Sequence, residues 1–144
     1  MENQSANIFN LVIWLLTPNH CSGIGLAIAK YLLTSPHSHN VVVVARSLEP
    51  LQKLKSEYNK QVEVLNGDLA DLTLPQKAVD LAVKSFGRLD GLILNHGILG
   101  QVGKIAQADL QEWKDGFDIN FISLVAFVSM LFWMLRKHPL TQLL

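Results

Sequence analysis

Short apolar runs alternate with longer stretches of helical spacing along this chain. Runs rich in aliphatic residues predict four strands, at 12–16, 41–44, 62–65 and 89–94. The run at 41–44 is four consecutive valines, which is typical of a strand buried on both faces of a parallel sheet. Helical spacing follows each strand and predicts helices that begin near Ser22, Leu48, Thr73 and Asp109. The last helix is expected to run to about Lys137, with a bend near Gly116.

The apolar positions also predict the buried face of each helix. In the first helix they are Ile24, Ala27, Ile28, Tyr31 and Leu32. In the second they are Leu51 and Leu54, and in the third they are Ala78, Val79, Ala82 and Val83. Asp109 and Glu112 stand three residues apart and predict a capped start for the fourth helix.

The order β-α-β-α-β-α-β-α fixes the expected fold class. Strands separated by helices of this length form right-handed crossovers and a parallel sheet that is covered on both sides. We therefore expect an α/β, doubly wound sheet of the Rossmann type that binds dinucleotides. At 144 residues the chain is one domain at most, and four strands make this domain incomplete.

Composition excludes several classes of protein. Hydrophobic residues make up 49% of the chain and charged residues 17%, which excludes a disordered chain. The formal net charge is zero, so no basic field is present to hold nucleic acid. The single cysteine, Cys21, excludes an internal disulfide and a cysteine-based zinc site. Cys21 and His20 together offer two metal ligands, which are too few for a metal site. A single cysteine favours a reducing, cytoplasmic compartment.

Two apolar stretches raise the alternative of membrane association. The stretch at 8–16 resembles the core of a signal peptide, but it is preceded by Glu2 and no Lys or Arg. The stretch at 121–135 contains Ser123 and Ser129 and is shorter than the about 20 residues of a typical spanning helix. Arg136 and Lys137 at its end resemble a positive flank. We expect no membrane span, with membrane association kept as an alternative.

The glycine turn Ser22-Gly23-Ile24-Gly25 stands where the first strand gives way to the first helix. A helix N-terminus offers unpaired N–H groups to a phosphate, and glycines let the backbone approach it closely. The alternative is an ordinary tight turn. The position between strand and helix favours the phosphate site.

Arg46 and Ser47 follow the second strand, where nucleotide-binding folds meet the ribose of adenosine. A carboxylate here would bind a 2′-hydroxyl, whereas an arginine accommodates a 2′-phosphate. This pattern favours NADP(H) over NAD(H). The alternative is a solvated arginine at a strand end.

Three further polar residues are candidates for the site. Asp68 and Asn95 follow the third and fourth strands, at the sheet edge where ligands bind, although both also suit ordinary turns. Asn120 is a polar residue within a very apolar helix. Its alternative role is a structural amide that is bonded to the backbone.

Together these residues resemble the short-chain dehydrogenase/reductase family of NAD(P)(H)-dependent oxidoreductases, from about Leu11 to Lys137. The stretch 41–120 is similar to fungal single-domain members. The resemblance rests on the order and spacing of five motifs: Ser22-Gly23-Ile24-Gly25, Ala45-Arg46-Ser47, Gly67-Asp68-Leu69, Leu94-Asn95-His96-Gly97 and Asp118-Ile119-Asn120.

The resemblance implies a role for each motif. The glycine turn would line the pyrophosphate, and Arg46 with Ser47 would meet the 2′-phosphate. Asp68 and Leu69 would flank the adenine. Asn95, His96 and Gly97 stand where the family has Asn-Ala-Gly, which steadies the sheet beside the cofactor. Asn120 matches the asparagine of the catalytic tetrad, which holds a water in the proton relay.

The chain departs from the family pattern in two places. Pro18 and Asn19 stand where the family opens its glycine turn with Thr-Gly. Neither Tyr31 nor Tyr58 begins the catalytic Tyr-x-x-x-Lys, since Ser35 and Val62 stand four residues later. The family's catalytic serine and tyrosine lie beyond the region matched.

We therefore expect a C-terminally truncated family member with little activity of its own. The alternative is a non-catalytic partner, homo- or hetero-oligomeric, that pairs with a complete subunit through the apolar helix that starts at Phe121 and ends at Leu135.

Overall fold

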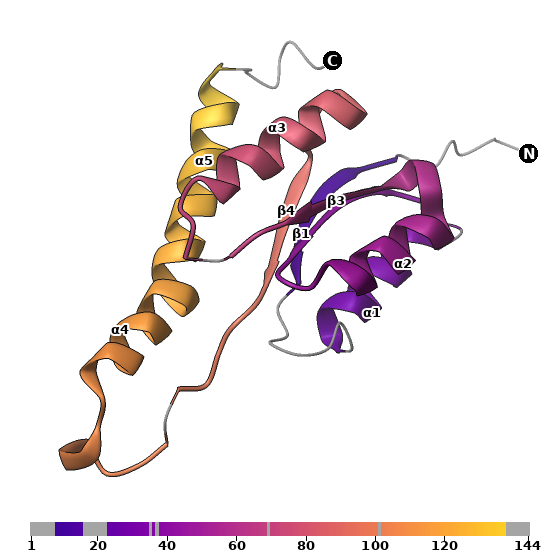
Figure 1. The fold of residues 1–144 in the computed structure, drawn as a ribbon. Helices are drawn as coiled ribbons and strands as arrows, with labels where there is room; N and C mark the ends of the chain where they lie inside the picture. The colour runs from indigo at the N-terminus through magenta and orange to yellow at the C-terminus, as the bar shows by residue number, and fades with distance from the viewer. Residues whose placement is uncertain are drawn as a thin grey trace, which may run out of the picture. The chain divides into compact units, whose positions relative to one another are not determined.

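Four parallel strands form one sheet in the order β3-β2-β1-β4 (Figure 1). In the computed structural model, which describes residues 8–15, 23–34, 36, 38–68, 70–100 and 102–137, the strands are β1 (Asn10–Leu15), β2 (Asn40–Ala45), β3 (Val62–Asn66) and β4 (Gly91–Asn95). Pairs such as Ala45 with Asn66 and Leu15 with Asn95 are in register, so all four strands end at the same edge. The predicted parallel α/β sheet is confirmed.

The described chain divides into two compact units. The sheet unit consists of Met1–Gly67 and Ala78–His96, and the helical unit of Asp68–Lys77 and Gly97–Leu144. The sheet unit contains all four strands, together with α1 (Ile24–Leu33) and α2 (Leu48–Tyr58). Helix α3 (Leu74–Phe86) begins in the helical unit and continues into the sheet unit from Ala78 onward.

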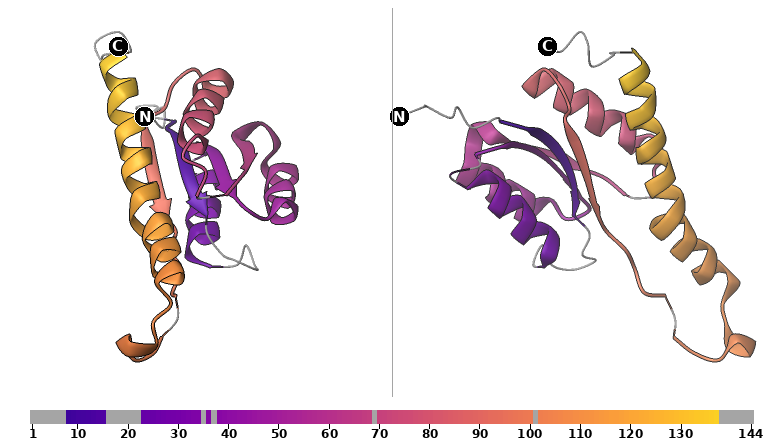
Figure 2. Two further views of the ribbon diagram at one scale, coloured as in Figure 1. Left: turned by 60° about the vertical axis from the view of Figure 1, so that its left-hand side comes forward. Right: turned by 180° about the vertical axis from the view of Figure 1, so that it is seen from behind.

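Helices cover both faces of the sheet. Helices α1 and α2 lie on one side of it, and the sheet-unit part of α3 lies on the other (Figures 1 and 2). The core under α1 and α2 is fully apolar and consists of Ile13, Ala29, Leu33, Val41, Val43, Ala45, Leu51, Leu54 and Val62. Because side chains alternate along a strand, Val12, Val42 and Val44 face the opposite side, and they too are fully buried. The prediction from the four valines is therefore confirmed.

The predicted inner face of α1 is wrong in part. The buried residues are Gly25, Ala29 and Leu33, whereas Ile24 is 73% exposed and Tyr31 65% exposed. The small residues Gly25 and Ala29 let this side of the helix pack against the sheet together with Leu33. Of the predicted residues, Ile28 and Leu32 are half-buried and pack against the same core. Ala27 is likewise exposed in α1.

The prediction for α3 is correct at three of its four positions. Ala78, Val79 and Ala82 are buried, but Val83 at the edge of the apolar stripe is exposed. The predicted inner face of α2 is correct, because Leu51 and Leu54 are both buried.

One long helical stretch dominates the helical unit. It comprises α4 (Leu110–Phe117), a π-helical turn (Asp118–Ile122) and α5 (Ser123–Lys137), as Figure 2 shows from two sides. Asp109 caps its start, because Oδ1 accepts from the backbone N–H of Gln111 at 2.7 Å and of Glu112 at 3.3 Å. The predicted N-cap at Asp109 is confirmed, whereas the return bond to Glu112 that would complete a capping box stays a prediction. The irregularity expected near Gly116 is the π turn that begins two residues later.

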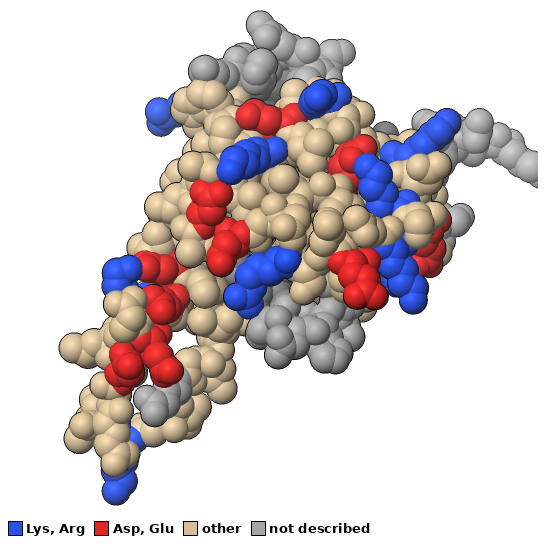
Figure 3. All heavy atoms as spheres, viewed as in Figure 1, with Lys and Arg blue, Asp and Glu red and all other residues tan. Residues whose placement is uncertain are grey.

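This stretch also bears on the membrane question. By length and composition, Leu110–Met134 is apolar enough to cross a membrane. One such helix is weak support, because the core helix of a soluble protein passes the same test. On the face in Figure 3, acidic and basic side chains are intermixed, in keeping with the net charge of zero.

Candidate functional site

Gly23 precedes α1 and has a backbone conformation that residues with a side chain rarely adopt. Gly23 has φ 147° and ψ −169°, a backbone conformation that favours glycine. Its carbonyl accepts from the N–H of Ala27 at 3.1 Å, so α1 starts at Ile24. The amides of the first turn have no intrahelical acceptor, and the first turn itself contains no acidic residue. Gly23, Ile24 and Gly25 thus form a helix start whose free amides are of the kind that can accept an anion.

Part of the predicted phosphate turn lies outside the described residues. This applies to Ser22 and to the two positions at which the sequence departs from the family, Pro18 and Asn19. His20 and Cys21 also lie outside the described residues.

Arg46 and Ser47 leave the sheet at the end of β2, next to β1. Arg46 is exposed, and none of the described residues pairs with its guanidinium. Ser47 is the N-cap residue of α2, yet its hydroxyl makes no capping hydrogen bond. An exposed cationic residue therefore follows β2, and a serine whose hydroxyl does not cap α2 comes directly after it.

Asn66 joins this group, and the sequence analysis missed it. Its Nδ2 donates to the carbonyl oxygen of Ala45 at 3.1 Å and to that of Arg46 at 2.6 Å. The side chain thus ties the end of β3 to the exit of β2. In the sequence, Asn66-Gly67-Asp68 resembles an ordinary turn, and only its place beside a strand end gives a signal.

Asn95 is the last residue of β4 at the same edge of the sheet, and His96 follows it. Asn95 is paired in register with Leu15 of β1, and both Asn95 and His96 are half-buried. Nδ1 of His96 is shielded from solvent. These two residues therefore lie at the strand-end edge, as predicted.

Asp68 belongs to the helical unit and organises a turn. Its Oδ1 accepts from the N–H of Ala70 at 3.0 Å, and its carbonyl accepts from the N–H of Asp71 at 3.1 Å. Asp68 therefore has the structural role in a turn that was one of its two predicted roles. The residue is also exposed. Leu69 lies outside the described residues.

Asp71 stabilises the turn that leads into α3. Its Oδ1 accepts from the N–H of Thr73 at 2.8 Å and from the hydroxyl of Thr73 at 2.6 Å. Its Oδ2 accepts from Nζ of Lys77 at 3.2 Å. These hydrogen bonds, with those from Thr73 first, lower the pKa of Asp71 to about 2. Asp71 is therefore a charged structural group.

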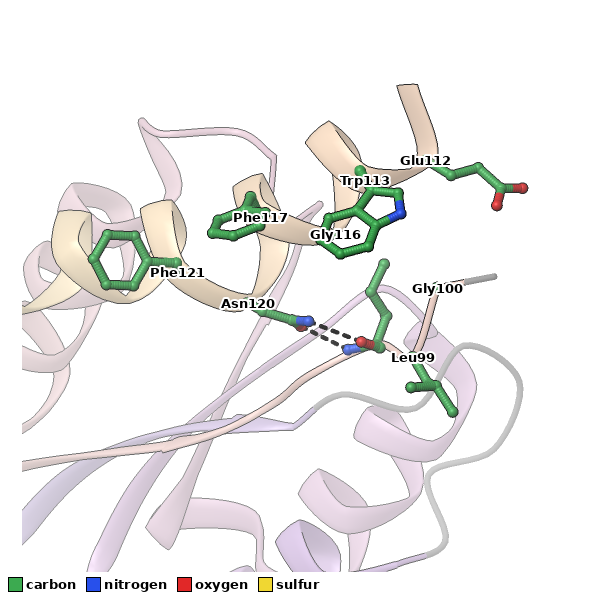
Figure 4. A pocket seen from close by; sticks show the side chains of 9 residues that line it. Leu99, Gly100, Glu112, Trp113, Gly116, Phe117, Asn120 and Phe121 are labelled. Carbon is green, nitrogen blue, oxygen red and sulfur yellow. Dashed lines mark hydrogen bonds between the residues drawn. The ribbon is translucent and has the colours of Figure 1, made fainter. Parts of the chain in front are cut away.

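Asn120 binds the loop after β4 within the helical unit. Its Oδ1 accepts from the N–H of Ile98 at 2.7 Å, and its Nδ2 donates to the carbonyl of Ile98 at 2.8 Å (Figure 4). A Cβ on Gly97 would lie 3.4 Å from Oδ1. The structural alternative for Asn120 is thus present, and it fixes the loop against the π turn.

A pocket of about 320 Å³ opens beside this contact. The lining residues include Trp113, Phe117 and Phe121, which Figure 4 shows on successive turns of the helix, and Leu99 and Gly100 of the loop. The rings of Trp113 and Phe117 stack with centroids 6.5 Å apart. The pocket is mostly apolar and belongs to the helical unit alone. Sequence analysis did not single out this pocket.

The chain is similar to a well-defined family. The family model described as short chain dehydrogenase matches residues 18–139. The chain belongs to the short-chain dehydrogenase/reductase family. An uncharacterized oxidoreductase of Schizosaccharomyces pombe is 38% identical over 124 residues, which cover 85% of this chain and 48% of that protein. An uncharacterized oxidoreductase of Saccharomyces cerevisiae is 36% identical over 115 residues, which cover 80% of this chain and 45% of that protein.

Solved structures agree with this assignment. The crystal structure of the Saccharomyces cerevisiae short-chain dehydrogenase/reductase has a TM-score of 0.79 at 32% identity, covering 88% of this chain and 49% of that one. L-sorbose reductase from Gluconobacter frateurii, complexed with NADPH and L-sorbose, has a TM-score of 0.68 at 25% identity, covering 86% of this chain and 47% of that one. This chain spans about half the length of the relatives that it matches.

Proposed function

We propose that this chain is the cofactor-binding part of an NADP(H)-dependent oxidoreductase that interconverts carbonyl and alcohol substrates. The observation that carries the proposal is Arg46, which is exposed, directly follows β2 and has no ion-pair partner among the described residues. No carboxylate ends β2, because Ala45, Arg46 and Ser47 follow its valines. The NADPH in the structure of L-sorbose reductase supports the choice of cofactor.

The described residues fit a dinucleotide. Gly23 leaves room for a pyrophosphate because it has no Cβ, and its positive φ directs the chain into α1. Arg46 and Ser47 would hold a 2′-phosphate through a charge-assisted hydrogen bond and a hydroxyl. When bound, the nicotinamide supplies or accepts the hydride. Asp68 would approach the adenine, and Asn95, His96 and Gly97 would steady the sheet edge.

Asn120 has a supporting role in this proposal. Its side chain binds both backbone groups of Ile98, so the π turn around it has a fixed position relative to the loop. A fixed turn is suited to hold one ordered water for a proton relay. The general acid that such a relay would feed is not among these 144 residues, since neither Tyr31 nor Tyr58 begins Tyr-x-x-x-Lys. We propose that the 144-residue chain alone binds cofactor but turns over little substrate.

Calorimetric titration of the purified chain with NADPH and with NADH tests the binding proposal. We expect clear binding of NADPH and at least about tenfold weaker binding of NADH. Binding of neither cofactor would contradict the proposal. A separate assay of NADPH oxidation with carbonyl substrates tests catalysis, and turnover above a no-protein control would contradict the proposed inactivity.

A second candidate function is that of a non-catalytic partner. Phe121, Val125, Val128 and Phe132 recur every three or four residues and are all exposed, which forms an apolar stripe along the long helix. Such a stripe suits pairing with another family subunit. Co-expression with a complete family member, followed by size-exclusion chromatography, tests it. A monodisperse monomer that never co-elutes with the complete subunit would contradict this candidate.

The proposed location is the cytoplasm, where NADPH and a single reduced cysteine are both expected. Fractionation of cells that express the tagged chain tests this proposal. Sedimentation with membranes, resistant to salt and released by detergent, would favour the membrane alternative instead.

A further inference from the structure

Asn66 contacts two successive backbone carbonyls where β2 and β3 end. It is the last residue of β3 and is paired in register with Ala45, the last residue of β2. Its Nδ2 donates to two successive carbonyls, 3.1 Å from that of Ala45 and 2.6 Å from that of Arg46. One amide group therefore binds both peptide groups that flank the Cα of Arg46.

The contact matters most for the carbonyl of Arg46, which no strand pairing holds. The N–H of Gly67 also donates to the carbonyl of Ala45, at 3.2 Å, so this carbonyl keeps a partner without Asn66. The carbonyl of Arg46 lies beyond the strand pairing, and Asn66 is its hydrogen-bond partner among the described residues. The Arg46 guanidinium has no ion-pair partner among the described residues, so only its backbone is held in place.

We infer that Asn66 is a positioning residue that sets selectivity for the 2′-phosphate by fixing the Arg46 peptide. This inference rests on the proposed function, in which Arg46 binds that phosphate. Holding Arg46 in place lowers the conformational entropy that is lost on binding, and this benefit reaches only ligands that carry the 2′-phosphate. Asn66 is itself exposed, so a role in packing the core does not explain its two hydrogen bonds.

The other edge of the sheet offers a matched control. Gln61 precedes β3, and its Nε2 donates to the carbonyls of Leu33 at 3.3 Å and His39 at 3.1 Å. It is the same kind of contact, from one amide to two carbonyls. It lies at the amino ends of the strands, away from Arg46. The variant Gln61→Ala therefore shows how much the loss of such a contact changes affinity when the contact is far from Arg46.

The experiment uses the full chain and two small probes. Adenosine 2′,5′-bisphosphate and adenosine 5′-monophosphate differ in the 2′-phosphate, and neither needs a nicotinamide site. Affinities for both are measured by calorimetry for the wild-type chain, Arg46→Ala, Asn66→Ala, Asn66→Leu and Gln61→Ala. Asn66→Leu retains a side chain of similar bulk but has no donor. Circular dichroism confirms that each variant is folded.

We expect the affinity ratio of the bisphosphate to the monophosphate to fall about tenfold in both Asn66 variants. In Gln61→Ala the ratio should stay within about twofold of the wild-type value. A wild-type ratio in both folded Asn66 variants would overturn the positioning role while leaving the proposed function intact. Equal affinity of the wild-type chain for both probes, unchanged in Arg46→Ala, would overturn the assigned role of Arg46 and this inference with it.

Discussion

Asn120 and Ile98 are joined by two hydrogen bonds, because one carboxamide binds both the N–H and the carbonyl of the same residue. The distances are 2.7 Å and 2.8 Å. The contact connects a π turn to the loop after β4, 22 residues apart in the chain. A side chain that the sequence marks as a candidate for catalysis therefore also holds the helical unit together.

We predict that Asn120→Ala destabilises the chain by about 1–2 kcal/mol, since two side-chain hydrogen bonds are lost. The backbone amide of Ile98 should also exchange its hydrogen faster. Urea denaturation and hydrogen-exchange mass spectrometry measure the two effects. The control is Gln111→Ala, which removes an exposed contact from Gln111 Nε2 to Asp115 Oδ1 on the same helical stretch. Unchanged exchange at Ile98 in Asn120→Ala would refute the prediction.

We expect the hydrogen bonds of Asp71 before α3 to make the stability of the chain depend on pH in the acid range. Its pKa is lowered from 3.8 to about 2 in the folded chain, so the charged carboxylate is favoured by folding. The stabilisation is present above the unfolded pKa and is lost as pH falls from about 4 towards 2. We predict that Asp71→Asn has a lower urea midpoint at pH 6 and a smaller loss of stability between pH 4 and 2. Parallel curves for variant and wild type across that window would exclude this role.

The strands and the parallel sheet could be predicted because they depend on which positions along the chain are apolar. The valines at 41–44 can hardly be accommodated except in a doubly covered strand, and all of them are buried. The strand-end positions of Arg46 and Asn95 follow from the same reasoning. The face of α1 could not be predicted this way, because Gly25 and Ala29 are buried for their small size and not for their hydrophobicity.

The contacts of Asn66 and Asn120 could not be predicted from periodicity. Both bind backbone carbonyls that are distant in sequence, and such partners leave no pattern along the chain. The π turn at Asp118–Ile122 is also invisible in the sequence, since it shifts hydrogen bonds without changing which residues are apolar. Candidate-site residues such as Asn120 are where structure is expected to depart from local rules.

Gly23 tests whether the phosphate turn depends on its backbone conformation. We predict that Gly23→Ala destabilises the chain by about 1–3 kcal/mol, because φ 147° is strained for any residue with a Cβ. NADPH binding should weaken at the same time. Gly100→Ala is the control, because a Cβ there meets nothing within 4 Å and its φ is not positive. Thermal denaturation and calorimetry provide the measurements, and a variant that matches Gly100→Ala in both would contradict the assigned turn.

Arg46 decides between the two nicotinamide cofactors in our proposal, and Arg46→Asp is the sharpest test of it. Loss of the guanidinium removes a charge-assisted contact, so NADPH affinity should fall about 10- to 100-fold. The new carboxylate stands where NAD-binding folds hold the ribose 2′-hydroxyl, so NADH affinity should be unchanged or higher. Lys60→Ala serves as the control for the loss of a positive charge, because Lys60 lies before β3, at the opposite edge of the sheet. Calorimetric titration of wild type and both variants with both cofactors gives the comparison. If NADPH and NADH affinity fall equally in Arg46→Asp, the residue supports the fold of the turn and does not select the cofactor.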